Sequence, residues 1–280
     1  MYWIFLILGL LALVIGSYTD FRTKEVPDWF SYGLIFAGVF LHVVYSAAIG
    51  SWTPLIYSLF GLAIGAGVAF AMFYLGQWGG GDAKMMMALG AIIGMEFSVS
   101  SFFLSFLVNV FFLGAFYGLA YGAVLAVRNK KDFARQFSKN YHKNSFARNI
   151  LVVFCALVVV SALFLPFQLK IYLALLAVIT VASYFLFIFA KSIEKCCMLH
   201  KVNPSVLTEG DWIAKDVFVR GKRICGPKDL GVSLEQIEKL KKLHVKEVPL
   251  KEGIPFVPSF LIAFLFSYFL GNVLFLIAGL

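Results

Sequence analysis

The longest uncharged stretch of the chain runs from residue 29 to residue 81 and reads WFSYGLIFAGVFLHVVYSAAIGSWTPLIYSLFGLAIGAGVAFAMFYLGQWGGG. It holds no Asp, Glu, Lys or Arg over 53 residues, whereas one membrane-spanning helix needs about 20 apolar residues. Gly50, Ser51 and Pro54 interrupt it near its middle, and such residues favour a helix end followed by a new start. We therefore predict two spans here, near residues 29–49 and 54–76.

The composition of the whole chain is typical of an integral membrane protein. Of its 280 residues, 61% are hydrophobic and 14% are charged, and the mean hydropathy is +0.88. An average soluble domain is about 45–50% apolar and about 25% charged. These values exclude a secreted disulfide scaffold, a disordered chain and a nucleic-acid-binding domain. The net charge of +9 is therefore expected to mark a cytoplasmic side rich in lysine and arginine.

The other apolar runs raise the predicted number of membrane spans to eight. Residues 1–19 form the first span, because they lack the basic start and the cleavage site of a signal peptide. The remaining spans are expected in the runs 85–95, 97–127, 149–166, 171–190 and 256–280. The run between Asp82 and Glu96 is the weakest, since its 13 residues cover only about 20 Å as a helix. The predicted fold class is an all-α polytopic membrane protein.

The distribution of basic residues predicts the orientation of these spans. With eight spans and the N-terminus outside, the cytoplasmic segments hold 23 of the 24 Lys and Arg residues, and only Lys170 lies outside. These segments are 20–28, 77–84, 128–148 and 191–254. Without the short fourth span, the seven basic residues of 128–148 would lie outside. The positive-inside bias therefore favours eight spans in this orientation.

The same runs divide the chain into five predicted segments. They are a membrane core of five spans at 1–127, a basic cytoplasmic loop at 128–148, two extra spans at 149–190, a small α+β cytoplasmic domain at 191–254 and a last span at 255–280. In the basic loop, charges alternate with Phe133, Phe137, Tyr141 and Phe146. This pattern is typical of a segment that lies on anionic lipid. Docking of a secretion machinery is the alternative use.

Local patterns predict the elements of the small domain. Residues 211–219 favour a strand, and Arg220, Gly221 and Lys222 favour a turn. Ser233-Leu-Glu-Gln236 is a capping box, which predicts a helix that continues to about Leu243. Among the spans, Gly61 and Gly65 form a Gly-x-x-x-Gly pattern that predicts close helix packing.

Two aspartates are expected at one face of the membrane. Asp20 lies at the inner end of the first span and Asp82 at the inner end of the fourth. Taken singly, Asp20 could be a solvated loop residue, and Asp82 could cap a helix that begins at Ala83. As a close pair, the two carboxylates would share one proton and could activate water against a peptide bond. This chemistry needs no metal or cofactor, and the four cysteines show no zinc or disulfide spacing.

The residues around Asp82 suit a peptide substrate. Gly79, Gly80 and Gly81 would let a substrate strand approach the backbone without side chains in the way. Lys84 could hold Asp82 in its ionised form or reach the lipid headgroups. Both uses stay open at this point.

Both aspartate regions resemble one known family. The stretch Thr19-Asp20-Phe-Arg-Thr-Lys-Glu-Val-Pro-Asp28-Trp, after an apolar span, resembles the first aspartate region of the type IV prepilin peptidases. The stretch Gly79-Gly80-Gly81-Asp82-Ala-Lys84-Met matches their Gly-x-Gly-Asp motif and the lysine that commonly follows. The resemblance is strongest to the archaeal prepilin and preflagellin peptidases. It covers residues 1–127 and resumes from about Gly253 to Asn272.

The resemblance implies a polytopic membrane aspartic endopeptidase. It would cleave class III signal peptides of pilin-like or archaellin-like precursors at the cytoplasmic face. Asp20 and Asp82 carry over as the catalytic pair, and Gly79 and Gly81 as the motif glycines. Better-known archaeal members have six spans, so the two extra spans are a departure. The short loop 21–28 lacks the large insert of bacterial relatives that also N-methylate their product, so we predict cleavage without methylation.

Some functional assignments remain alternatives at the level of sequence. Glu25 and Asp28 could attract the basic segment of a signal peptide, or they could merely balance Arg22 and Lys24. A proton-coupled transporter could use the same aspartate pair. A non-enzymatic membrane subunit could use residues 191–254 as an adaptor.

Overall fold

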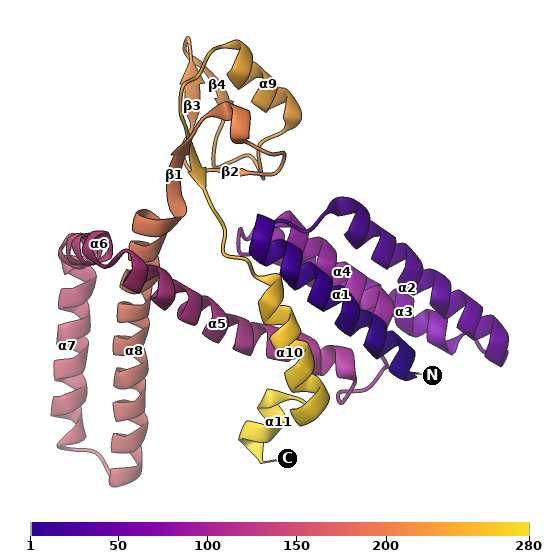
Figure 1. Ribbon diagram of the computed structural model, residues 1–280. Coiled ribbons are helices and arrows are strands. Elements are labelled where there is room, and N and C mark those ends of the chain that lie inside the picture. The colour runs from indigo at the N-terminus through magenta and orange to yellow at the C-terminus, as the bar shows by residue number, and fades with distance from the viewer. Residues whose placement is uncertain (1, 280) are drawn as a thin grey trace. The chain divides into compact units, whose positions relative to one another are not determined.

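The computed structural model describes residues 2–279 and divides the chain into two units. The first consists of Met1–Tyr121 and Gly253–Leu280, and the second of Gly122–Glu252. Figure 1 shows the helices and strands of both. The first unit contains the helices α1 (Tyr2–Thr23), α2 (Asp28–Ile49), α3 (Thr53–Tyr74), α4 (Gly80–Ile93), α10 (Val257–Leu270), α11 (Val273–Ala278) and most of α5 (Phe102–Arg128).

The break predicted within the longest uncharged stretch is confirmed. Helix α2 ends at Ile49, and Gly50 follows it in the left-handed conformation with φ of 68°. Helix α3 begins at Thr53 with Pro54 in its first turn. Glycine tolerates positive φ, and proline at this position loses no helical hydrogen bond, so the two residues end one helix and start the next.

Helix α4 is the centre of the first unit. Nine of its 14 residues are buried, and α1, α2 and α3 pack against it. The close approach depends on the absence of side chains, because a Cβ on Gly61 of α3 would overlap the carbonyl oxygen of Gly90. A Cβ on Gly65 would lie 3.0 Å from the carbonyl oxygen of Met86. The packing predicted for Gly61 and Gly65 is thus confirmed, and their partner is α4.

The surroundings of α4 explain how so short an apolar helix is accommodated. A helix of 14 residues spans about 21 Å, less than the hydrocarbon core of a bilayer. The length of a lipid-facing helix must match that core, whereas α4 is largely covered by protein.

The structure contains fewer long apolar helices than the eight predicted spans. Six helices among residues 2–279 are long and apolar enough to cross a membrane: Trp3–Thr23, Asp28–Ile49, Thr53–Tyr74, Phe102–Arg128, Ser145–Ala162 and Phe167–Met198. The chain is thus a multi-pass membrane protein. The other two expected spans are the short helix α4 and the run 255–280.

The run 255–280 is divided, which differs from the single span predicted. Gly271, with φ of 75°, separates α10 from α11. The buried amide of Asn109 on α5 holds this break: it donates to Ser267 Oγ and the Gly271 carbonyl oxygen at 2.8 Å each, and accepts from the Val273 N–H at 2.9 Å. These bonds satisfy backbone and side-chain polar groups that would cost free energy if they lacked a partner in an apolar environment.

The second unit combines a helical hairpin with a small α+β domain. Its helices are α6 (Lys130–Lys143), α7 (Ser145–Ala162), α8 (Phe167–Ile193), the π-helical turn η1 (Glu194–Met198), the 3-10 turn η2 (Pro204–Val206) and α9 (Leu234–Lys242). Its strands are β1 (Leu199–Val202), β2 (Trp212–Ile213), β3 (Val217–Val219), β4 (Lys222–Cys225) and β5 (Val248–Lys251). They form a three-stranded antiparallel sheet in the order β1-β5-β2 and a hairpin of β3 and β4.

The local predictions for the small domain hold in most details. The capping box is confirmed: the Ser233 N–H donates to Gln236 Oε1 at 2.9 Å, and the Gln236 N–H donates to Ser233 Oγ at 3.3 Å. The turn at Arg220 and Gly221 is confirmed, with positive φ at both. The single strand predicted over 211–219 is wrong, because β2 and β3 belong to different sheets.

The basic segment 128–148 is largely helical rather than a loop. Helix α6 covers most of it and packs against α8, where the rings of Phe133 and Phe189 lie 5.7 Å apart. The Asn140 amide, buried, donates to Ser192 Oγ at 3.0 Å. Phe133 and Asn140 therefore contact the chain itself, whereas Phe146 at the start of α7 is 79% exposed.

Candidate active site

The buried carboxylate of Asp20 is held by the start of α10. Asp20 lies near the C-terminal end of α1 and is only 5% exposed. Its Oδ2 accepts a hydrogen bond of 2.9 Å from the backbone N–H of Val257, the first residue of α10. The first N–H groups of a helix lack partners within the helix and carry partial positive charge. The start of α10 thus stabilises a negative charge on Asp20.

Asp82 lies in the first turn of α4. The helix begins at Gly80, with Gly79 as its N-cap, so the alternative in which Asp82 caps a helix beginning at Ala83 is wrong. Asp82 is the third helical residue, and its Oδ2 accepts a hydrogen bond of 2.9 Å from the Gly79 N–H. The side chain is partly exposed, in contrast to that of Asp20. Each carboxylate therefore accepts a hydrogen bond from a backbone N–H at a helix start, α10 for Asp20 and α4 for Asp82.

The fold brings the two aspartates into electrostatic range. The charge on Asp20 acts on Asp82, and helices α1 and α4 pack against each other. Two neighbouring carboxylates repel each other when both are ionised, which favours a state that holds one proton between them. A pair that holds one proton would contain both a base and an acid, the requirement for direct attack of water on a peptide bond.

The three glycines before Asp82 have different surroundings. None of them has positive φ. A Cβ on Gly81 would lie 3.2 Å from the backbone nitrogen of Val26, so Gly81 admits the chain's own connection between α1 and α2. A Cβ on Gly79 would lie 3.4 Å from Asp82 Oδ2. Nothing lies within 4 Å of the corresponding point at Gly80, so this glycine offers an open backbone beside Asp82.

Lys84 forms an ion pair with Asp28 at the start of α2. Its ammonium group also lies 5.4 Å from the centre of the Tyr32 ring. This pairing was not among the uses expected for Lys84, and it links the start of α2 to α4. The Asp28 side chain is nevertheless 65% exposed, and Glu25 is exposed in the connection before it. The two acids predicted to recognise substrate thus lie on the surface, Glu25 in the connection after α1 and Asp28 at the start of α2.

A group of aromatic rings, formed by Trp78, Tyr117, Phe256 and Phe260, adjoins the residues that hold the aspartates. Trp78 directly precedes Gly79, and Phe256 directly precedes Val257; their ring centres lie 6.1 Å apart. Tyr117 on α5 packs edge-on against Phe256 at 6.4 Å. The sequence analysis missed this group, because only the tertiary fold brings its members together.

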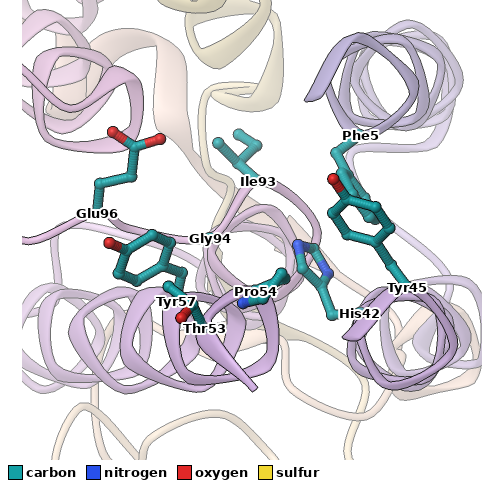
Figure 2. Close-up of a pocket in the computed structure, with 9 residues that line it drawn as sticks. All are labelled: Phe5, His42, Tyr45, Thr53, Pro54, Tyr57, Ile93, Gly94 and Glu96. Atoms are coloured by element: carbon teal, nitrogen blue, oxygen red, sulfur yellow. The ribbon is translucent and has the colours of Figure 1, made fainter. Parts of the chain in front are cut away.

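One cavity of the first unit lies apart from the aspartates. It has a volume of about 160 Å³ and is lined by Phe5, His42, Tyr45, Thr53, Pro54, Tyr57, Ile93, Gly94 and Glu96 (Figure 2). Within it the Phe5 and His42 rings stack at 3.9 Å. Phe5 and Ile93 occupy the ends of α1 and α4 opposite to those that carry Asp20 and Asp82. The cavity therefore plays no part in the chemistry of the pair.

Among residues 2–279, no group of three or more His, Cys, Asp or Glu side chains is placed to hold a metal ion. The arrangement around Asp20 and Asp82 offers carboxylates and backbone N–H groups, whose chemistry is acid–base catalysis.

Residues 6–121 match the sequence profile of the Type IV leader peptidase family. Over 86 residues, the chain is 35% identical to a preflagellin peptidase of Methanococcus voltae, covering 31% of this chain and 36% of that protein. It is 37% identical over 87 residues to the preflagellin peptidase of Methanococcus maripaludis, covering 31% and 37% respectively. A preflagellin peptidase of Methanocaldococcus jannaschii is 32% identical over 87 residues.

These matches confirm the resemblance found in the two aspartate motifs. The chain spans 36–37% of the length of the curated relatives it matches. The family match contains both Asp20 and Asp82 and ends at residue 121, the last residue of the first part of unit one. The part of the chain that carries the aspartate pair is therefore similar to the type IV leader peptidase family.

Proposed function

We propose that this chain is a membrane-embedded aspartic endopeptidase that removes signal peptides from preflagellin-like or pilin-like precursors. The observation that carries the proposal is the pair of Asp20 and Asp82 on the packed helices α1 and α4, each bonded to a backbone N–H at a helix start. The proposal is further supported by the family match over residues 6–121 and by three relatives named preflagellin peptidases.

The pair can hydrolyse a peptide bond with one proton shared between its carboxyl groups. The ionised carboxylate removes a proton from a water molecule, whose oxygen forms a bond to the carbonyl carbon. The protonated carboxyl gives its proton to the carbonyl oxygen. When the tetrahedral intermediate collapses, the C–N bond breaks and the leaving nitrogen takes up the proton that came from water, while a hydroxyl of the intermediate returns its proton to the second carboxylate and becomes the new carbonyl. Water is the only co-reactant, and the pair returns to its starting state.

The substrate would meet this pair from the open side of Gly80. An extended segment there could lie against the backbone next to Asp82 without meeting a side chain within 4 Å. The hydrophobic helix of a precursor would then lie among the spans, and its short basic segment would remain at the membrane surface. Glu25 and Asp28 are exposed acids that would attract that segment.

We place the cleavage at the cytoplasmic face and expect no N-methylation of the product. The first inference rests on the positive-inside distribution of basic residues around the loop that follows Asp20. The second rests on the connection between α1 and α2, which is only residues 24–27. Mass spectrometry of the cleaved precursor would test it: an unmodified N-terminus is expected, and a mass increase of one methyl group would contradict it.

A proton-coupled transporter that uses the same pair is not favoured, because the matched family and relatives are peptidases. The transporter would also place its carboxylates near the middle of the membrane. Asp20 and Asp82 instead lie near helix ends.

Co-expression with a tagged preflagellin-like precursor tests the proposal. The wild type, Asp20→Asn and Asp82→Asn would be compared at equal protein levels, with the precursor's size scored on a gel. Asp132→Asn is the matched control, since Asp132 is an exposed acid of the second unit. We expect a shortened product with the wild type and with Asp132→Asn, and no shortened product with Asp20→Asn or Asp82→Asn. Full processing by Asp82→Asn would overturn the proposal.

A further inference from the structure

The hydroxyl of Tyr117 is buried without a hydrogen-bond partner. Among the described residues, it shares this condition with Ser17, Ser31 and Tyr184. Leaving a buried polar group without a partner costs free energy, so such a group in a native structure calls for an explanation. Tyr117 is on α5 within the first unit, in the region that matches the peptidase family.

The Tyr117 ring packs next to the backbone group that holds Asp20. It packs on Phe256 with ring centres 6.4 Å apart and an angle of 75° between the planes. Phe256 precedes Val257, whose N–H donates to Asp20. Gly114 lies one turn before Tyr117 on α5, and a Cβ there would come within 2.7 Å of the Phe256 ring, so α5 and Phe256 are in close contact.

The hydroxyl also lies in the electric field of the aspartate pair. The charges of both Asp20 and Asp82 act on it, whereas no hydrogen bond joins it to either. Its proton is therefore not committed to a hydrogen bond with either aspartate. A phenolic O–H in this position can donate to a third group that enters the site.

We propose that Tyr117 is a substrate-contacting residue of the peptidase, whose hydroxyl donates a hydrogen bond to the oxygen of the scissile carbonyl. The inference rests on the proposed function. When water adds to the carbonyl carbon, negative charge develops on this oxygen, and preorganised donors lower the energy of that state. Tyr117 keeps its proton throughout, while the proton transfers remain those of the aspartate pair.

The substitution Tyr117→Phe tests this role, because it keeps the ring that packs on Phe256 and removes only the unpartnered hydroxyl. Loss of one such donor lowers kcat by about 10²–10³-fold in known hydrolases. For loss of the neutral phenol hydroxyl here, we expect kcat to fall by at least about tenfold. Because the interaction strengthens in the transition state, KM should change by less than about twofold. Thermal unfolding should be unchanged or shifted upward, since no hydrogen bond is lost.

Tyr184→Phe is the matched control, since Tyr184 also has a buried hydroxyl without a partner but belongs to the second unit. Steady-state cleavage of a precursor would be measured for the wild type, Asp82→Asn and both tyrosine variants. Of the two tyrosine variants, only Tyr117→Phe is expected to lose kcat. Wild-type kcat in Tyr117→Phe, or an increased KM with unchanged kcat, would overturn the inference. Cleavage that persists in Asp82→Asn would instead refute the proposed function itself.

Discussion

At the scale of single residues, the candidate site depends on backbone donors at two helix starts. Asp20 is bound by the Val257 N–H and Asp82 by the Gly79 N–H, each at 2.9 Å. These bonds orient the carboxylates and favour their charged forms. Repulsion between the two carboxylates opposes ionisation of both at once. Under the proposed function, these two effects would leave the pair with one shared proton.

The exposed acids Glu25 and Asp28 give a prediction about substrate binding. The double variant Glu25→Gln/Asp28→Asn should raise KM several-fold for a precursor with a basic segment and leave kcat nearly unchanged, because charge attraction acts equally in the ground and transition states. Steady-state cleavage at low and high salt would measure it, and salt should reduce the difference. A precursor with its basic residues neutralised is the control. The same rise in KM with that precursor would contradict recognition by charge.

At the scale of elements, packing against α4 depends on small residues at particular positions. Gly61 of α3 faces the backbone of Gly90, whereas Gly67 on the same helix has nothing within 4 Å of its would-be Cβ. The two glycines therefore form a matched pair for substitution, one in a backbone contact and one in open space.

Gly61→Ala should destabilise the protein by about 1–3 kcal/mol, since the added methyl group must push two backbones apart. Gly67→Ala should be neutral or slightly stabilising, because alanine is the better helix former. Thermal unfolding of the purified protein in detergent measures both. Equal unfolding temperatures for the two variants would show that the close contact of α3 and α4 is not as described.

The small domain offers a prediction about pH. Arg223 pairs with Asp216 and with Asp229, and the Gly226 N–H donates to Asp229 Oδ2 at 2.8 Å. Burial raises the pKa of Asp229, but the hydrogen bonds from Arg223 and Gly226 outweigh it and hold that pKa below its usual range. A carboxyl with a lowered pKa in the folded state contributes stability above its unfolded pKa, and that contribution disappears as the pH falls through the folded value.

Asp229→Asn should therefore weaken the amide protection of residues 222–237 at neutral pH. The difference from the wild type should shrink in acid, below the pKa that Asp229 has in the folded protein. Hydrogen-exchange mass spectrometry of the full chain at matched pH values measures this. A difference that grows as the pH falls would contradict the sign of the linkage.

At the scale of the whole molecule, the distribution of basic residues predicts one orientation of the apolar helices in the membrane. Large hydrophobic side chains such as Val159 and Val178 are exposed along α7 and α8, as expected for surfaces in lipid. Only Lys170, near the start of α8, lies outside in the predicted topology. The hairpin of α7 and α8 is visible in Figure 1.

The orientation predicts opposite labelling of two positions in intact cells. In a variant without its four native cysteines, Lys170→Cys should react with a membrane-impermeant thiol reagent, and Lys131→Cys should react only after the cells are opened. Both side chains are on the hydrophilic ends of their elements, so both should be reactive in detergent. Labelling of Lys131→Cys in intact cells would contradict the predicted orientation and would indicate that the aspartate pair faces the outside.

The sequence by itself determined the features that local rules control. The helix break at Gly50 and Pro54, the capping box at Ser233 and the motifs around Asp20 and Asp82 each depend on neighbouring residues, whose conformational preferences act over a few positions. Apolar composition likewise sufficed to identify a multi-pass membrane protein, because the bilayer demands it of every span.

Only the tertiary structure decided which distant groups meet. The hydrogen bond from Val257 to Asp20 joins residues 237 positions apart, and Asn109 divides the last apolar run by bonds to residues more than 150 positions away. The burial of α4, the role of Gly81 beside Val26 and the place of Tyr117 depend on the same packing. Such contacts leave no periodic or local signature, since their free energy arises from groups that approach only when the helices assemble.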